Sequence, residues 1–220
     1  MKPYYKNELT TIYNGDCLDI LKEMADNSVE LILTDPPYGI GASKGVGGFG
    51  ASSDTAKKYD DDWDNFVPSK EYFDEILRVG KSVIIFGGNY FADIIPVNGH
   101  WIVWDKVSNI QFDNPFSDCE LAWTNLNKKT VKKYTLVQQG FLTSEKVRYH
   151  PTQKPVALFI QILQDYNKDK GLVMDCFSGS FTTAIACEQL GIKNISIEKL
   201  QKYCDIGIKR LNSLQIKFDI

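Results

Sequence analysis

Four consecutive residues, Asp35-Pro36-Pro37-Tyr38, combine a carboxylate, two rigid prolines and a flat ring directly after an apolar run. The amino nitrogen of adenine or cytosine is a poor nucleophile because its lone pair is delocalised into the ring. A carboxylate and a main-chain carbonyl, here those of Asp35 and Pro36, can accept both N–H hydrogens and direct the lone pair toward an electrophile. The motif therefore predicts a reaction at an aromatic amine. The alternative is an Asp-Pro turn that only ends a strand.

The neighbouring residues suit this chemistry. The two successive prolines fix the backbone φ angle and keep the acceptors rigid. Tyr38 offers a flat ring on which an extruded base can stack, because a base inside a duplex cannot present its amino group to a protein. We therefore interpret Asp35, Pro36, Pro37 and Tyr38 as the catalytic residues.

A second candidate site lies in the last third of the chain, where a turn of small residues joins a predicted strand to a predicted helix. The turn reads DCFSGSFTTA from Asp175 to Ala184, and Gly179 lets the main chain approach a ligand closely. The turn lacks the Gly-Lys-Ser/Thr of a phosphate loop and the full GxGxxG of a dinucleotide site, which favours an adenosine cofactor without pyrophosphate. The alternative is a turn kept small for tight packing, with Asp175 as a helix cap.

Glu198 supports the ligand interpretation. Asp175 and Glu198 each follow a predicted strand, and ligands of open α/β sheets bind beyond the carboxyl ends of strands. An acid about 20 residues after a glycine turn commonly accepts hydrogen bonds from ribose hydroxyls. We expect Glu198 to do so here.

The elements that must position these residues follow from apolar periodicity. Runs typical of strands cover residues 10–13, 29–33, 82–86, 101–104, 120–123, 172–174 and 194–197. Helical spacing covers residues 17–24, 72–79 and 182–190, and a further helix begins around residues 159–163. This order predicts an α/β domain with a mainly parallel sheet, and the length of 220 residues favours a single domain over residues 1–220.

Two segments interrupt this pattern. Residues 39–64 are rich in Gly, Ser, Lys and Asp, which predicts a mobile loop that serves as a lid. Residues 125–149 are basic and predict a small target-recognition segment, in which Gln138 and Gln139 could pair with adenine edges. Its expected DNA-binding residues are Lys128, Lys129, Lys132, Lys133 and Arg148. The alternative is a solvated basic loop.

Composition limits other functions. The net charge of −3 argues against a surface that binds nucleic acid everywhere, so any contact with phosphates must be local. The five scattered cysteines predict reduced, mostly buried side chains, and neither they nor the two histidines have metal-ligand spacing. We expect no metal site. No apolar stretch approaches the ~20 residues of a membrane span and no secretory signal is evident, which predicts a cytoplasmic protein without membrane contact.

Three segments together resemble the DNA amino-methyltransferase family. They are NGDCLDILKEMADNSVELILTDPPY (residues 14–38), HPTQKP (150–155) and FSGSFTTA (177–184). The catalytic tetrapeptide precedes the cofactor turn, which is the permuted order of the family's beta class. The resemblance implies a Rossmann-like methyltransferase fold, with helices on both faces of a mainly parallel sheet and one antiparallel strand. It also implies S-adenosylmethionine as cofactor, double-stranded DNA as substrate, a homodimer, and a bacterial, phage or other mobile-element source.

The resemblance also assigns cofactor contacts, to Asp16 beside the adenine, Lys154 beside the carboxylate, and Phe177, Gly179, Ser180 and Thr182 along the methionine and ribose. For Asp16 the alternative is an N-cap of the following helix. Phe181 stands where the family usually has Gly, so its ring either crowds the methionine or turns aside. The expected reaction is methylation of the adenine amino group in DNA at a short specific sequence. Cytosine-N4 methylation and a catalytically silent DNA-binding homologue are the alternatives.

Overall fold

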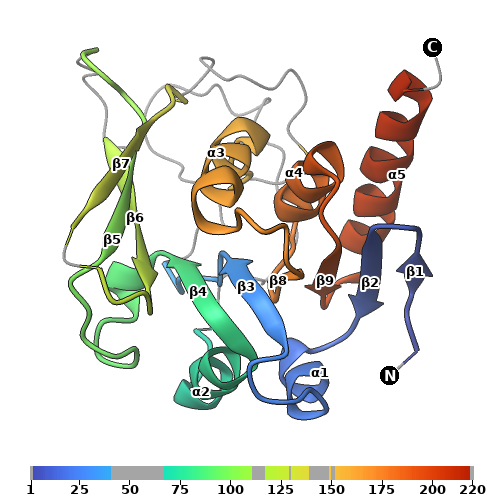
Figure 1. Ribbon diagram of the computed structural model, residues 1–220, viewed down its shortest axis with the longest axis horizontal. Coiled ribbons are helices and arrows are strands. Elements are labelled where there is room, and N and C mark those ends of the chain that lie inside the picture. The colour runs from blue at the N-terminus through green and yellow to red at the C-terminus, as the bar shows by residue number, and fades with distance from the viewer. Residues whose placement is uncertain are drawn as a thin grey trace, which may run out of the picture.

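The computed structural model describes residues 2–40, 67–110, 117–128, 130–138, 149 and 152–218, with side chains described as far as residue 214. In these ranges nine strands form one sheet in the order β1-β2-β9-β8-β3-β4-β6-β5-β7 (Figure 1). The strands are β1 (Tyr5–Lys6), β2 (Thr10–Asn14), β3 (Val29–Thr34), β4 (Gly80–Phe86), β5 (Trp101–Asp105), β6 (Cys119–Thr124), β7 (Lys132–Thr135), β8 (Val173–Asp175) and β9 (Asn194–Glu198).

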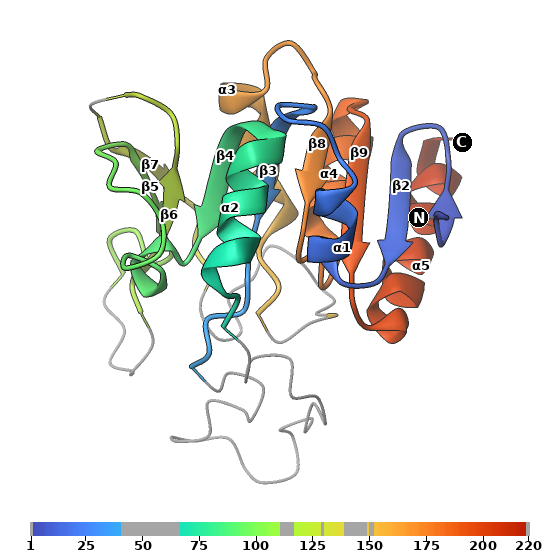
Figure 2. The same ribbon diagram turned by 90° about the horizontal axis from the view of Figure 1, so that it is seen from below.

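Helices cover both faces of this sheet, which confirms the predicted Rossmann-like α/β architecture. α1 (Cys17–Lys22) and α2 (Lys70–Val79) lie on one face, and α3 (Val156–Tyr166), α4 (Thr182–Leu190) and α5 (Gln201–Phe218) lie on the other (Figure 2). A short 3₁₀ helix, η3 (Gly88–Tyr90), follows β4. Alternate residues of β4 serve the two layers: Val83 and Ile85 pack with α1 and α2, while Ile84 and Phe86 pack with α3.

Most strands run parallel, but two run antiparallel to their neighbours where one was predicted. β6 is antiparallel to both β4 and β5, and β1 is antiparallel to β2. The second reversal has a local cause in Asn7, whose side-chain oxygen accepts hydrogen bonds from the N–H groups of Leu9 and Thr10. This Asx turn folds the chain back on itself and creates the two-residue β1.

The parallel register brings strand ends to one edge. Thr34 pairs with Ile85, Ile32 with Met174, Asp175 with Ser196, and Asn14 with Glu198. The residues that follow β2, β3, β8 and β9 therefore all emerge at the same carboxyl edge of the sheet. This is the edge at which ligands of open α/β folds bind.

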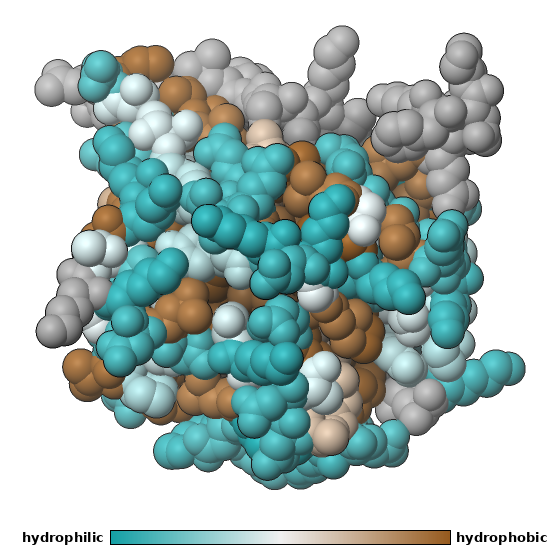
Figure 3. Space-filling view, viewed as in Figure 1, coloured by the Kyte–Doolittle hydropathy of each residue, from teal (hydrophilic) through white to brown (hydrophobic). Residues whose placement is uncertain are grey.

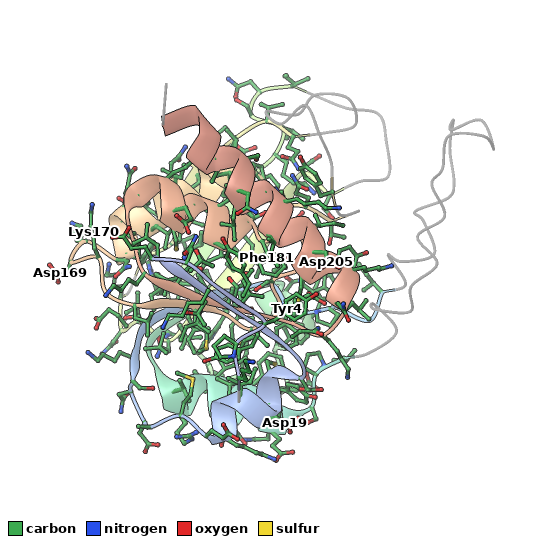
Figure 4. The ribbon with its side chains drawn as sticks, turned by 90° about the vertical axis from the view of Figure 1, so that its right-hand side faces the viewer. Tyr4, Asp19, Asp169, Lys170, Phe181 and Asp205 are labelled. Atoms are coloured by element: carbon green, nitrogen blue, oxygen red, sulfur yellow. The ribbon has the colours of Figure 1, made fainter. Side chains whose placement is uncertain are left out.

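Four elements were not predicted: the short β1 and η3, the strand β7 and the helix α5. α5 carries apolar residues at helical spacing, and Cys204, Ile208 and Leu211 pack against Phe181 and Ile12. Its amino-terminal half is tied to the edge of the sheet by Tyr4, whose hydroxyl donates to Asp205 at 2.8 Å (Figure 4). The strand β7 lies within the segment predicted for target recognition.

The surface and the cysteines agree with a globular domain. On the face drawn in Figure 3, hydrophilic residues are interspersed with smaller apolar areas. Cys17, Cys176, Cys187 and Cys204 are buried free thiols and Cys119 is exposed, so the cysteines are mostly buried as predicted. Among the described helices, none is long and apolar enough to cross a membrane.

Candidate active site

Buried hydrogen bonds of Thr34 join the two predicted half-sites. The hydroxyl of Thr34, the last residue of β3, donates to Asp175 Oδ1 at 2.8 Å. Asp35 follows Thr34 directly, so the start of the catalytic tetrapeptide and the start of the cofactor turn lie on neighbouring strand ends. The fold thus brings Asp35 and Asp175, which are 140 positions apart in the sequence, to neighbouring strand ends.

The Asp35 carboxylate is held on both oxygens. The Tyr38 hydroxyl donates to Oδ1 at 2.6 Å, and the Lys154 ammonium contacts Oδ2. The Asp35 side chain keeps 23% of its surface exposed, and Pro36 beside it is buried. Burial raises the pKa of Asp35, and the nearby Lys154 cation opposes that rise. Asp35 is therefore a partly accessible acceptor with a fixed orientation.

Lys154 lies between two carboxylates, which sequence reasoning did not foresee. Its Nζ is 3.2 Å from Glu120 Oε2, and its side chain is only 5% exposed. Glu120 also pairs with Lys106 at 3.1 Å. Burial lowers the pKa of Lys154, but the negative charges of Asp35 and Glu120 raise it by more, so the net shift is upward. Burial raises the pKa of Glu120, but Lys154 and Lys106 lower it more.

The Tyr38 ring is fixed by its neighbours. Tyr90, which is 44% exposed, stacks on it with ring centroids 4.8 Å apart and an interplanar angle of 18°. Gly87 has a φ of 69°, and a Cβ added there would lie 2.1 Å from the Tyr38 ring. Only glycine therefore fits this turn. Burial, followed by the charge of Asp35, raises the pKa of Tyr38, so its hydroxyl stays protonated and can donate.

In the cofactor turn, Asp175 anchors the main chain. Its Oδ1 also accepts from the Phe177 N–H at 3.1 Å, and its Oδ2 accepts from the Thr183 hydroxyl at 2.6 Å. Burial raises the pKa of Asp175 to about 6. The N-cap of α4 is Phe181, so Asp175 is not the cap of that helix. Its contact with a cofactor stays a prediction.

The other end of the turn is held by Glu198. Its two oxygens accept from the N–H groups of Gly179 at 2.9 Å and Leu200 at 2.7 Å. Burial raises the pKa of Glu198, and these N–H groups lower it in part. The Thr182 hydroxyl lies 3.2 Å from both Ser180 Oγ and the carbonyl oxygen of Lys154, which links the turn to the catalytic side.

Asp16 does cap a helix. Its Oδ1 accepts from the Leu18 N–H at 3.1 Å, which confirms the N-cap alternative. Its Oδ2 accepts from the Tyr72 hydroxyl at 2.9 Å and from Lys199 at 3.2 Å. The Tyr72 ring lies 6.3 Å from that of Phe177. Asp16 and Phe177 are thus brought to one side of the turn, with Tyr72 between them as a residue that sequence reasoning missed.

Phe181 turns aside. Its backbone is left-handed, with φ 64°, and its fully buried ring packs against Ile12, Cys204 and Leu211 between β2 and α5 (Figure 4). A Cβ added to Gly207 of α5 would lie 2.5 Å from the ring. The glycine therefore makes room for Phe181, and of the two alternatives the structure has the ring turned away from the cofactor turn.

Of the predicted DNA-binding residues, Lys128 and Lys132 contact the end of α3 that is remote from Lys154, whereas Lys133 pairs with Asp105, which directly precedes Lys106. Lys132 pairs with Asp165 and Lys133 with Asp105, each at 3.1 Å, and the Lys128 ammonium lies 5.0 Å from the Tyr166 ring centroid. Asp165 and Tyr166 end α3 and Lys154 precedes it, a separation of roughly 16 Å along the helix. Lys129, Arg148 and residues 41–64 of the predicted lid lie outside the described residues.

The described residues contain no group of three or more His, Cys, Asp or Glu side chains that could hold a metal ion. The charged groups of the site are instead paired with one another. The arrangement combines a mainly parallel sheet, in which β1 and β6 are reversed, with acids at successive strand ends, which defines the class of Rossmann-like α/β folds.

Comparison with known proteins agrees with this class. The family model for DNA methylases, N6_N4_Mtase, matches residues 101–209. The type II methyltransferase M.HinfI of Haemophilus influenzae is 28% identical over 98% of this chain and 72% of its own length. M2.LlaDCHI of Lactococcus lactis subsp. cremoris is 25% identical over 96% of this chain and 92% of its own. These matches support the DNA amino-methyltransferase family (N6/N4) as the family of this chain.

Solved structures share the fold. The M1.HpyAVI–SAM complex superposes with a TM-score of 0.59 at 22% identity, covering 93% of this chain and all of that one. The cytosine-N4-specific PvuII DNA methyltransferase also gives a TM-score of 0.59, at 16% identity, covering 96% of this chain and 95% of that one. At these identities the likeness confirms the Rossmann-like architecture alone.

Proposed function

We propose that this protein transfers a methyl group from S-adenosylmethionine to the N6 amino group of adenine in DNA, at a short specific sequence. One observation carries the proposal: Asp35 emerges beside Asp175, so an acceptor for an amino group adjoins the turn predicted to hold the donor. Family membership supports methyl transfer to a base amino group.

The residues of the turn fit the donor. Asp16 follows β2, and Glu198 ends the neighbouring strand β9. Carboxylates at this edge can accept from ribose hydroxyls or the adenine amino group. Phe177 and Tyr72 offer aromatic surface nearby, and Gly179 leaves main chain accessible. M1.HpyAVI, which shares this fold, has been crystallised with SAM. When bound, the sulfonium supplies a methyl group that is already electrophilic.

The chain's own residues would act on the base. Asp35 and the Pro36 carbonyl accept the two hydrogens of the amino group, and Tyr38 holds Asp35 in place through its 2.6 Å hydrogen bond. The nitrogen would gain the methyl group that the sulfonium releases as its bond to that carbon breaks. It would also lose one proton, for which Asp35 is the adjacent acceptor. Burial raises the pKa of Asp35, and the neighbouring Lys154 cation favours its ionised, accepting form.

Adenine is preferred because an Asp in the first motif position is the family's usual choice for that base. Cytosine-N4 transfer is the second candidate, since the fold is shared with a cytosine-N4-specific enzyme. DNA incubated with protein and donor, then digested and analysed by mass spectrometry, separates the outcomes. N6-methyladenine supports the proposal, N4-methylcytosine selects the second candidate, and unmodified DNA selects a silent DNA-binding homologue.

The remaining predictions from the sequence are part of this proposal. DNA phosphates would contact Lys128, Lys129, Lys132, Lys133 and Arg148, and residues 39–64 would close over the site as a lid. We also propose a homodimer, which light scattering after size-exclusion chromatography would test. The proposed location is the cytoplasm of a bacterium.

A further inference from the structure

Two lysines and two carboxylates alternate in a chain of contacts that ends at the catalytic aspartate. Lys106 Nζ lies 3.1 Å from Glu120 Oε1, and Lys154 Nζ lies 3.2 Å from Glu120 Oε2. Lys154 in turn contacts Asp35 Oδ2. Glu120 stands between two cations, and it belongs to none of the three segments that carry the family resemblance.

Every donor of the Lys154 ammonium has an acceptor in reach. An ammonium carries three N–H donors, and its neighbours are Asp35, Glu120 and the Tyr38 hydroxyl oxygen at 3.3 Å. With 5% of its side chain exposed, Lys154 depends on these partners, because an unpaired buried charge is strongly unfavourable. Any motion that separates it from one carboxylate must leave it with another.

The proposed reaction requires such a motion. Asp35 must accept a hydrogen from the amino group of the base, yet its oxygens already accept from Tyr38 and Lys154. A carboxylate has about four lone-pair sites, but a cation in contact with Oδ2 weakens it as an acceptor for another donor. The contact between Lys154 and Asp35 must therefore lengthen when the base binds.

We propose that Glu120 is a positioning residue that takes over the Lys154 ammonium as the target base enters, which frees Asp35 Oδ2 for the amino hydrogen. The inference rests on the proposed function. Glu120 Oε2 is already 3.2 Å from Nζ, so rotation of the terminal torsions of Lys154 suffices and the ammonium stays buried. Lys106, on the other oxygen of Glu120, keeps that carboxylate ionised and oriented.

A double-mutant cycle tests the transfer of the ammonium. Glu120→Gln keeps the shape of the side chain and removes its charge, so we expect kcat to fall roughly ten- to a hundredfold. The dissociation constant for S-adenosylmethionine, measured by calorimetry, should stay unchanged. In a Lys154→Met background the same substitution should change kcat less than about twofold, because no ammonium is left to move. Asp165→Asn, which removes the partner of Lys132, is the matched control and keeps wild-type kcat.

The pH profile separates positioning from a merely structural role. Glu120→Gln removes a negative neighbour of Asp35, which lowers the pKa of that carboxyl. The acidic limb of the kcat profile should therefore move to lower pH. Glu120→Asp, which restores the charge at a shorter reach, should recover part of the lost rate.

The inference is overturned if the losses of kcat from Glu120→Gln and Lys154→Met are additive in the double variant. It is also overturned if Glu120→Gln changes only the affinity for the donor. It is also overturned if Lys154→Met weakens donor binding while Glu120→Gln keeps full kcat, which would assign the lysine to the donor's carboxylate. These results leave the proposed function standing, because the wild-type protein still methylates DNA. A wild-type protein that methylates no base overturns the proposed function and this inference with it.

Discussion

The catalytic corner around Asp35 and the cofactor turn from Asp175 to Glu198 hold their acids by different means. Asp35 and Glu120 face lysine side chains, whereas Asp175 and Glu198 accept hydrogen bonds from main-chain N–H groups and threonine hydroxyls. Main-chain donors are fixed by the fold, while a lysine ammonium can move between partners. The difference indicates that the turn is a rigid cradle and that the corner can rearrange when its substrate arrives.

The largest expected effect is a loss of kcat that comes from the catalytic corner and leaves the cofactor turn intact. Asp35→Ala should lower kcat by at least about a hundredfold, since it removes the acceptor that orients the amino group. Donor affinity should be unchanged, because the contacts of Glu198 and Gly179 do not involve Asp35. Transfer assays and calorimetry measure the two quantities. The control is Asp19→Ala, which removes an exposed acid on α1 (Figure 4). Full activity in Asp35→Ala would refute the proposed mechanism.

The rigidity of the turn depends on Phe181 and Gly207. Gly207→Ala brings a methyl group against the Phe181 ring and should reduce the free energy of unfolding by about 1–3 kcal/mol. Phe181→Gly leaves a cavity and should reduce it by about 3–5 kcal/mol, less a small gain from a relaxed left-handed backbone.

Combining the two substitutions sharpens the test. In the Phe181→Gly background, Gly207→Ala should stabilise the protein, because the clash is gone and alanine favours a helix by about 1 kcal/mol. Urea denaturation measures each step. Gly99→Ala, where a Cβ meets nothing within 4 Å, is the control. Equal effects of Gly207→Ala in both backgrounds would show that the ring does not occupy the space above Gly207.

A pH dependence follows from the burial of Asp175. Its folded pKa of about 6 lies above the usual value of an aspartic acid, so the folded state binds the proton more tightly than the unfolded state does. Its contribution to stability is therefore present at low pH and is lost as pH rises from about 4 to about 6. Relative to Asp175→Asn, wild-type stability should fall over that window by at most about 3 kcal/mol. A difference that stays constant with pH would contradict this assignment.

The smallest effects on stability are expected outside both regions. Lys132→Glu and Lys133→Glu break exposed ion pairs, so each should change the free energy of unfolding by under about 1 kcal/mol. DNA affinity should nevertheless fall, with a reduced salt dependence, while donor affinity stays constant. Fluorescence anisotropy with labelled duplexes, read at several salt concentrations, measures this. Equal loss of donor and DNA binding would refute the separation of roles.

Sequence reasoning found the strand ends because local apolar runs mark them. Asp35, Asp175 and Glu198 each follow such a run, and their meeting at one edge follows from a parallel sheet. Glu120 could not be found this way, since its contact with Lys154 depends on the antiparallel pairing of β6 with β4, the neighbour of β3. β7 was missed because KKYT is short and carries two lysines, whereas the α5 spacing of Cys204, Ile208 and Leu211 was a readable signal.

The outermost strands of the sheet bear on how two copies could associate. β7 presents Lys132, Lys133 and Thr135 outward around a buried Tyr134, and β1 at the opposite border spans two residues. Charged or very short border strands oppose the continuation of one sheet into another. Among the described residues, neither edge strand favours pairing with a strand of a second copy. A second copy would therefore have to bind to a helical or loop surface.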